Sequence, residues 1–242
     1  MIPISDTNPV RRFPMVNWAL VAINIIVFVY ELTLRPRALD GLFMTWGITP
    51  WNILLALAHP LRATPAIGLT LITSQFLHAG WVHLIGNMLF LWVFGDNVED
   101  ALGHLPYLLF YLAGGVIAGL AQVFILGPAR VPSIGASGAI ASVLGAYVVL
   151  YPWSRIRILI PLILLFWTIE VPAVLVLGWW FIQQFFYGAA ALSEVASGVA
   201  FWAHIGGFVA GMIGVLPFVG GMRRRRRITF AFDDFDSTRG SM

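Results

Sequence analysis

The stretch SIGASGAIAS, residues 133–142, sets a serine among small residues at the start of an apolar segment. That segment runs from Ser137 to about Leu150, and as a helix its 14 residues would cover about 21 Å. A bilayer's hydrocarbon core is about 30 Å thick, so a helix of this length that ends at one interface begins about 10 Å below the other. Its first N–H groups cannot stay unpaired in lipid, which predicts a water-filled cavity around Ser137.

The composition is that of a polytopic membrane protein. Of 242 residues, 60% are hydrophobic and 10% are charged, and the mean hydropathy is +0.87. The absence of cysteine excludes structural disulfides, thiolate metal sites and cysteine nucleophiles. Five arginines form one run at 223–227, directly after an apolar segment. Such a run is more typical of contact with anionic membrane lipids than of nucleic-acid binding, so no nucleic-acid partner is predicted.

Six apolar segments are predicted to cross the membrane. They are 16–34, 82–101, 105–126, 137–151, 156–186 and 201–221. Residues 42–57 are also apolar, but Gly47, Pro50 and the pair His59-Pro60 interrupt them, which favours a partly helical loop at the membrane interface. The expected fold is therefore an all-α polytopic membrane protein, a six-helix bundle with a short central fourth helix and an interfacial first loop.

The arginines predict the orientation of this bundle. Residues 1–15 are expected to be a cytoplasmic segment, 16–222 the membrane domain, and 223–242 a basic, flexible cytoplasmic tail. The first span follows Arg11 and Arg12 without a small-residue cleavage site, which indicates an uncleaved anchor. With both termini inside, ten arginines face the cytoplasm and four face the outer side, as the positive-inside rule requires. A bacterial cytoplasmic membrane is the expected location.

Polar side chains gather at the outer ends of spans two, four and six. His83 and Asn87 are four residues apart and share one helix face, while Ser137 and His204 open the other two spans. A serine hydroxyl becomes a nucleophile when a base takes its proton, so His204 is the candidate base for Ser137. The Ser137 N–H, His83 and Asn87 could bind the oxyanion formed on acyl attack. Glu31 and Glu170 are expected in other spans and away from this level, which predicts a dyad rather than a triad.

These residues resemble those of the rhomboid intramembrane serine proteases. Gly135-Ala136-Ser137-Gly138 matches the family's GxSG, and Ala203-His204-Ile205-Gly206-Gly207, followed by Gly211, matches its AHxxGxxxG. The stretch FLHAGWVHLIGNMLFLWVFGDNVEDALG, residues 76–103, matches span two, with His78, His83 and Asn87 in HxxxxHxxxN and Glu99 in GxxxExxxG. The three motifs follow one another in the family's order.

The resemblance implies a function and a set of roles. It implies peptide-bond hydrolysis through an acyl-enzyme on Ser137, with His204 as base and an active site open to the outer side. The implied partners are membrane lipids and single-span membrane-protein substrates, which would pass between spans two and five. Gly135, Gly138, Gly207 and Gly211 would allow tight helix packing, His78 would shape the cavity rim, and Glu99 would tie span ends together. No cofactor, metal or oligomeric state is predicted.

The sequence departs from the family pattern at two places. Leu69-Thr70 stand where many members carry Trp-Arg, and Ala141 stands where some carry an aromatic residue that stacks on the histidine. Neither departure touches the predicted dyad. The Ala141 position predicts that His204 is less firmly held than in those members.

Other interpretations of the same residues stay open. Ser137 and its glycines suit plain helix packing, and His83 with Asn87 could be an interhelical hydrogen-bond pair. The whole chain could be a catalytically silent member that binds transmembrane helices, or a small transporter that uses Glu170 in span five. The sequence lacks the HExxH motif of zinc proteases, and GASGA does not match the GxSxG of soluble hydrolases.

Overall fold

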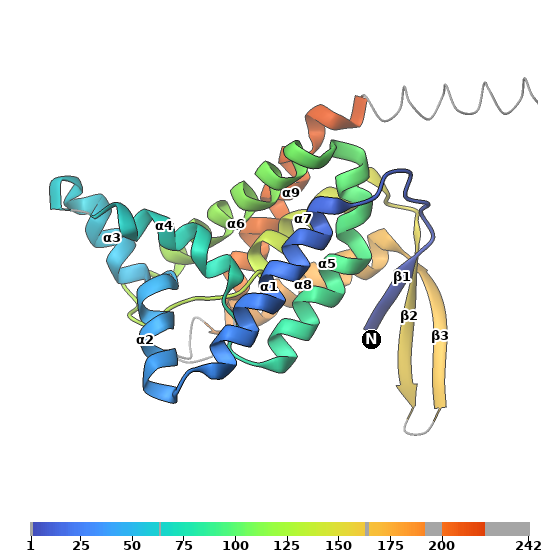
Figure 1. Cartoon of the computed structure of the whole chain (residues 1–242). Helices are drawn as coiled ribbons and strands as arrows, with labels where there is room; N and C mark the ends of the chain where they lie inside the picture. The colour runs from blue at the N-terminus through green and yellow to red at the C-terminus, as the bar shows by residue number, and fades with distance from the viewer. Residues whose placement is uncertain (1, 63, 163–164, 192–199, 221–242) are drawn as a thin grey trace, which may run out of the picture.

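The computed structural model describes residues 2–62, 64–162, 165–191 and 200–220, which form a mostly helical protein (Figure 1). The larger helices are α1 (Met15–Thr33), α5 (Trp81–Leu102), α6 (His104–Leu126), α7 (Ser137–Leu150), α8 (Ala173–Ala191) and α9 (Phe201–Gly214). The shorter elements between α1 and α5 are α2 (Pro36–Trp46), α3 (Pro50–Ala58), η1 (Pro60–Arg62), α4 (Pro65–Thr73) and η2 (Ser74–Phe76). The arginine-rich tail lies outside the described residues.

Three described helices are long and apolar enough to cross a membrane, namely α1, α6 and α8. A fourth span results if α5 is joined to the segment Pro65–Phe76, from which it is bent by 83°. Helices α7 and α9 are apolar but have only 14 residues each, about 21 Å of helix. The chain is therefore an integral membrane protein with three to four candidate spans, and the count of six stays a prediction.

Helix α7 lies at the centre of the helical bundle and packs closely on α9. Every residue from Gly138 to Tyr147 is buried. Glycines bring the two helices together, because a Cβ built on Gly211 would lie 1.9 Å from the Ser142 carbonyl oxygen. A Cβ on Gly207 would lie 2.3 Å from the carbonyl oxygen of Gly138. Any larger residue at either position would push α9 away from α7.

The fifth predicted span is wrong in its first half. Residues 156–162 and 165–172 do not form a helix; they lie in strands β2 (Arg155–Leu162) and β3 (Leu165–Pro172), and α8 begins only at Ala173. The strands pair antiparallel, with Arg157 opposite Glu170. The mean hydropathy of a continuous apolar run is the same whether the run folds as a strand or as a helix. The prediction of a helix rested on the length of the apolar run and was therefore wrong here. The β-branched and aromatic residues on β3 favour the strand.

The fold is consequently not all-α. Strand β1 (Ile2–Asp6) pairs antiparallel with β2, which gives a three-stranded sheet in the order β1-β2-β3 beside the helical bundle. The sheet also removes Glu170 from the membrane span assigned to it. Glu170 is 38% exposed and forms an ion pair of 3.2 Å with Arg157. The transporter interpretation therefore loses the buried carboxylate on which it depended.

A polar cluster joins the sheet to the end of α7. The Tyr147 hydroxyl donates to the Asp6 carboxylate and accepts a 2.9 Å hydrogen bond from Asn8 Nδ2. Asn97 Nδ2 donates to the same Asp6 oxygen at 3.0 Å, and Ser154 Oγ lies 3.2 Å from the Tyr147 hydroxyl. Burial raises the pKa of Asp6, while these hydrogen bonds counteract the rise. We call these five residues the Tyr147 cluster.

Glu99 connects the start of α1 to the end of α5. Its carboxylate accepts the backbone N–H groups of Val16 at 3.0 Å and Asn17 at 2.7 Å, and lies 2.5 Å from His104 Nδ1. Helix α1 follows Pro14, whose side chain makes no capping hydrogen bond. Glu99 thus supplies acceptors that the first turn of α1 needs.

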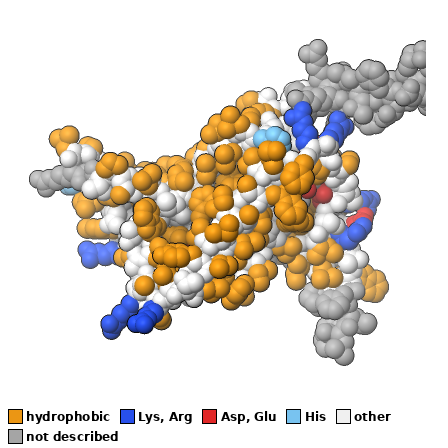
Figure 2. Space-filling model, in the orientation of Figure 1, with side chains coloured by type: hydrophobic (Ala, Val, Ile, Leu, Met, Phe, Trp, Pro, Cys, Tyr) orange, Lys and Arg blue, Asp and Glu red, His pale blue; other side chains and the backbone are white. Residues whose placement is uncertain are grey.

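The surface separates apolar and charged residues. Figure 2 shows hydrophobic side chains over the middle of the helical bundle, while arginines gather toward its periphery. Large apolar side chains such as Ile26, Leu109 and Phe186 are more than half exposed. Such a surface fits hydrocarbon rather than water.

Candidate active site

Ser137 is the first residue of α7, and the chain reaches it through a glycine with a positive φ. Gly135 has a φ of +125°, a conformation that L side chains rarely adopt, and its N–H donates a 2.8 Å hydrogen bond to the Ser74 carbonyl. A Cβ on Gly135 would lie 2.6 Å from His83 Nε2. Glycine is therefore required at this position both for the turn and for the approach of His83.

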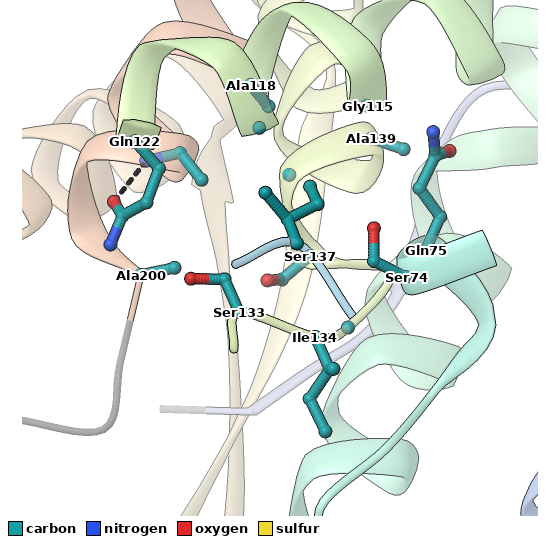
Figure 3. Close-up of a pocket in the computed structure, with 15 residues that line it drawn as sticks. Ser74, Gln75, Gly115, Ala118, Gln122, Ser133, Ile134, Ser137, Ala139 and Ala200 are labelled. Atoms are coloured by element: carbon teal, nitrogen blue, oxygen red, sulfur yellow. Dashed lines mark hydrogen bonds between the residues drawn. The ribbon is translucent and has the colours of Figure 1, made fainter. Parts of the chain in front are cut away.

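His204 lies in the first turn of α9, directly beside Ser137. Its Nε2 lies 2.8 Å from Ser137 Oγ, within hydrogen-bond distance. Helix α9 has no capping side chain of its own at Ala200. Instead Gln122 Oε1, from α6, accepts the N–H of Ala203 at 3.1 Å, the dashed line in Figure 3. Helix α6 thus holds the end of α9 that carries the imidazole.

Helix α8 supplies two further contacts to His204 that the sequence analysis missed. Gln184 Oε1 lies 2.7 Å from His204 Nδ1. The centroids of the Trp180 ring and the imidazole are 5.7 Å apart, and the two ring planes are inclined at 36°. Helix α8 thus supplies an aromatic contact to His204 where position 141 supplies none, and the expectation that His204 is less firmly held than in other members stays a prediction. An amide in an apolar helix is costly, and this was the signal available for Gln184.

His83, Asn87 and His78 lie together on the Gly135 side of Ser137. Asn87 Nδ2 lies 3.0 Å from His78 Nε2, and the rings of His78 and His83 are 5.1 Å apart. From the Cβ position built on Gly135, Asn87 Nδ2 is 3.8 Å away. The site therefore brings two side-chain nitrogens, from His83 and Asn87, to the turn that precedes Ser137.

Glu31 is closer to the site than the sequence predicted. Its carboxylate accepts the backbone N–H of His78, with oxygens at 3.2 and 3.3 Å, and it is buried on α1. It lies beside the bend between η2 and α5, so the expectation that Glu31 stands away from this level is wrong. Glu99 is sixteen residues beyond His83 on α5, about 24 Å along the helix, and belongs to the opposite end of the bundle.

A cavity of about 30 Å³ opens beside Ser137 (Figure 3). Its polar lining residues are Ser74, Gln75, Gln122, Ser133 and Ser137. Gln75 Oε1 is buried and has no hydrogen-bond partner among the described residues. A water molecule needs at least about 10–15 Å³ measured in this way and two or more polar partners, so the cavity has room for about two. Gly138 and Ala139 add little bulk to its wall.

The site offers oxygen and nitrogen groups for acid–base chemistry. Within the described ranges no three His, Asp or Glu side chains are grouped closely enough to hold a metal ion. The chemistry that the arrangement supports directly is transfer of the Ser137 proton to His204 Nε2, with N–H donors nearby for a developing anion.

Comparison with known proteins gives consistent matches. The Rhomboid domain family model matches residues 67–220. Rhomboid-like protein 11, chloroplastic, from Arabidopsis thaliana is 28% identical over 166 residues, which cover 68% of this chain and 52% of that protein. Rhomboid protein 1, mitochondrial, from Saccharomyces cerevisiae is 30% identical over 202 residues, 81% of this chain and 51% of that protein. Rhomboid protease GluP from Bacillus subtilis is 46% identical over 76 residues, which cover 31% of this chain and 14% of that protein.

The matched segments span about half, or less, of these relatives' length. The relatives' names place one in chloroplasts and another in mitochondria, while a third comes from a bacterium. These names do not favour the expected bacterial cytoplasmic membrane over the other two, so that location stays a prediction.

Proposed function

Because the chain belongs to the rhomboid family, we propose that it is an intramembrane serine protease with Ser137 as nucleophile and His204 as general base. The observation that carries this proposal is the 2.8 Å contact between Ser137 Oγ and His204 Nε2. Ser137 also lines a cavity to which four further Ser and Gln side chains contribute. Helix packing alone would not need a serine and an imidazole to meet beside such a cavity.

The reaction follows from this geometry in two halves. Ser137 Oγ attacks the substrate carbonyl carbon while its proton passes to His204 Nε2. The resulting oxyanion is stabilised by the Ser137 N–H together with His83 and Asn87. When the C–N bond breaks, the imidazolium gives its proton to the leaving amine, and an ester remains on Ser137. Water from the cavity then attacks the ester with His204 again as base, which releases the carboxylic acid and restores Ser137.

Rhomboid proteases act on transmembrane substrates, and the small residues around Ser137 suit a close-lying substrate backbone. Gly135 and Gly138 let His83 and Ala118 pack close to the backbone on either side of Ser137, and Gly207 and Gly211 bring α9 near enough for His204 to reach the hydroxyl. The proposed substrates are single-span proteins cut near the outer end of their helix. His78 and Glu99 have supporting roles. His78 is buried and is not among the residues that line the cavity, so its role is to hold Asn87 rather than to shape the cavity rim, and Glu99 acts at the far end of α5.

Labelling and cleavage test this function together. The wild-type protein in lipid vesicles should cleave a single-span reporter and react covalently with a fluorophosphonate probe. Ser137→Ala and His204→Ala should each abolish both readouts without loss of fold. The matched controls are Ser5→Ala on the sheet and His59→Ala on an exposed loop, which should leave both readouts unchanged. Full labelling of Ser137→Ala would refute the assignment, and no labelling of the wild type would favour a catalytically silent member.

A further inference from the structure

Helix α8 contacts the imidazole of His204 on two sides. Trp180 and Gln184 are four residues apart, so both point from the same face of α8. The Trp180 ring is tilted by 36° to the imidazole with the ring centroids 5.7 Å apart, and Gln184 Oε1 lies 2.7 Å from Nδ1. Gln184 is only 9% exposed. The histidine is therefore oriented by a helix that carries neither Ser137 nor His204.

With its Oε1 turned toward the ring, as in this structure, Gln184 fits one neutral form of the imidazole. An amide oxygen can only accept a hydrogen bond, so Nδ1 must carry the hydrogen when it faces Gln184 Oε1. In the neutral ring Nε2 then holds the free lone pair, and it is Nε2 that lies 2.8 Å from Ser137 Oγ. This is the tautomer that can take the serine proton. The other tautomer would point an N–H at the hydroxyl that has to be deprotonated.

We propose that Gln184 is a positioning residue that holds His204 in the form able to act as the base for Ser137. This inference rests on the proposed function. Gln184 acts through the imidazole and does not touch the substrate. Because its amide is neutral, it contributes orientation and tautomer selection and adds no charge to balance the imidazolium, unlike the aspartate of a triad.

Hydrogen bonds attach the start of α8 to the segment that follows α7, and this fixes the position of Gln184 further along the helix. The N–H of Ala173 donates to the Ser154 carbonyl at 2.8 Å, and that of Val174 donates to the Pro152 carbonyl at 3.0 Å. Gln184 lies eleven residues further on, about 16 Å along the helix. Docking of α8 on α9 thus decides whether the base is oriented.

The experiment compares two neighbouring glutamines in the full chain in lipid vesicles. Gln184→Met keeps the side-chain length but removes the oxygen acceptor, and Gln184→Glu keeps an acceptor at Nδ1. The matched control is Gln183→Met, the same change about 100° around the helix, where the side chain is half-buried. The kcat and KM for the reporter and the rate of fluorophosphonate labelling are measured for each.

Gln184→Met should lower kcat and the labelling rate by about tenfold to a hundredfold, part of what a positioned base supplies, with KM unchanged. Gln184→Glu should recover most of the rate, and Gln183→Met should match the wild type. Equal kcat values for Gln184→Met and Gln183→Met, in a protein whose wild type is active, would overturn the inference and leave the function standing. A wild type without Ser137-dependent labelling would instead overturn the function.

A spectroscopic measurement decides the inference even if Gln184→Met does not fold. The ¹⁵N spectrum of histidine-labelled wild type, assigned with His204→Ala, distinguishes the two neutral tautomers. A hydrogen on Nδ1 of His204 supports the inference, and a hydrogen on Nε2 contradicts it.

Discussion

The two ends of helix α7 carry two polar clusters of different kinds. At one end Ser137 meets His204 beside a cavity of about 30 Å³. At the other end the Tyr147 hydroxyl is hydrogen-bonded to Asp6, Asn8 and Ser154, and Asn8 also donates to Asp6. In the first cluster polar atoms face the cavity, whereas in the second the polar atoms are hydrogen-bonded within the cluster. The same 14-residue helix thus separates a site suited to chemistry from a joint suited to anchoring the sheet.

The largest effect on activity is expected from a change at the Ser137 end. Asn87→Ala should lower kcat by about tenfold to a thousandfold, the scale for one lost oxyanion donor, while KM changes little. Reporter cleavage in vesicles measures it, with the exposed Asn52→Ala as the matched control. An unchanged kcat would remove Asn87 from the oxyanion site and leave it as a hydrogen-bond partner of His78 alone.

A change between the two ends should affect both fold and activity. Gly211→Ala adds a Cβ that would lie 1.9 Å from the Ser142 carbonyl oxygen, so α9 must shift away from α7. We expect a loss of about 1–3 kcal/mol in the free energy of unfolding, together with slower cleavage as His204 moves. Thermal unfolding in detergent measures the first effect. The control is Gly86→Ala, whose Cβ would have nothing within 4 Å and should be neutral or stabilising.

The Tyr147 end should respond in stability without a change in catalysis. Tyr147→Phe removes a hydroxyl bonded to the Asp6 carboxylate and should cost about 1–2 kcal/mol of unfolding free energy. Because Tyr147 lies ten residues from Ser137, about 15 Å along α7, kcat should stay as in the wild type. Tyr30→Phe, exposed on α1, is the matched control. A large fall in kcat at unchanged stability would contradict the division between the two ends.

The smallest effect is expected on the sheet itself. Glu170→Gln removes an exposed ion pair with Arg157 and should change the free energy of unfolding by less than about 1 kcal/mol, with cleavage unaffected. Arg157→Gln should give the same result. Loss of activity in Glu170→Gln alone would mean that this carboxylate has a role beyond the sheet. The hypothesis of a small transporter that uses Glu170 would then have to be considered again.

Residue spacing was sufficient to predict the candidate dyad but not its full surroundings. The i, i+4 relation of His83 and Asn87 and the small residues around Ser137 follow from helix geometry, so their convergence could be predicted once the spans were aligned. Gln184 could not be placed in this way, because which face of α8 meets α9 depends on packing between helices that are distant in sequence. The same holds for Glu31, which contacts the His78 backbone across the bundle.

The sequence by itself determined that this is a membrane protein, and it gave the bounds of α1, α5, α6 and α7 to within a residue. It also pointed to Ser137 and His204 as candidates, because hydropathy and helical periodicity are local properties of the chain. Tertiary structure decided that residues 155–162 and 165–172 pair as strands with each other and with the N-terminal strand. It also decided that the aromatic contact to the imidazole comes from α8 rather than from α7. Strand pairing and helix contacts join residues far apart in the chain, and their energies depend on the partner that packing brings near.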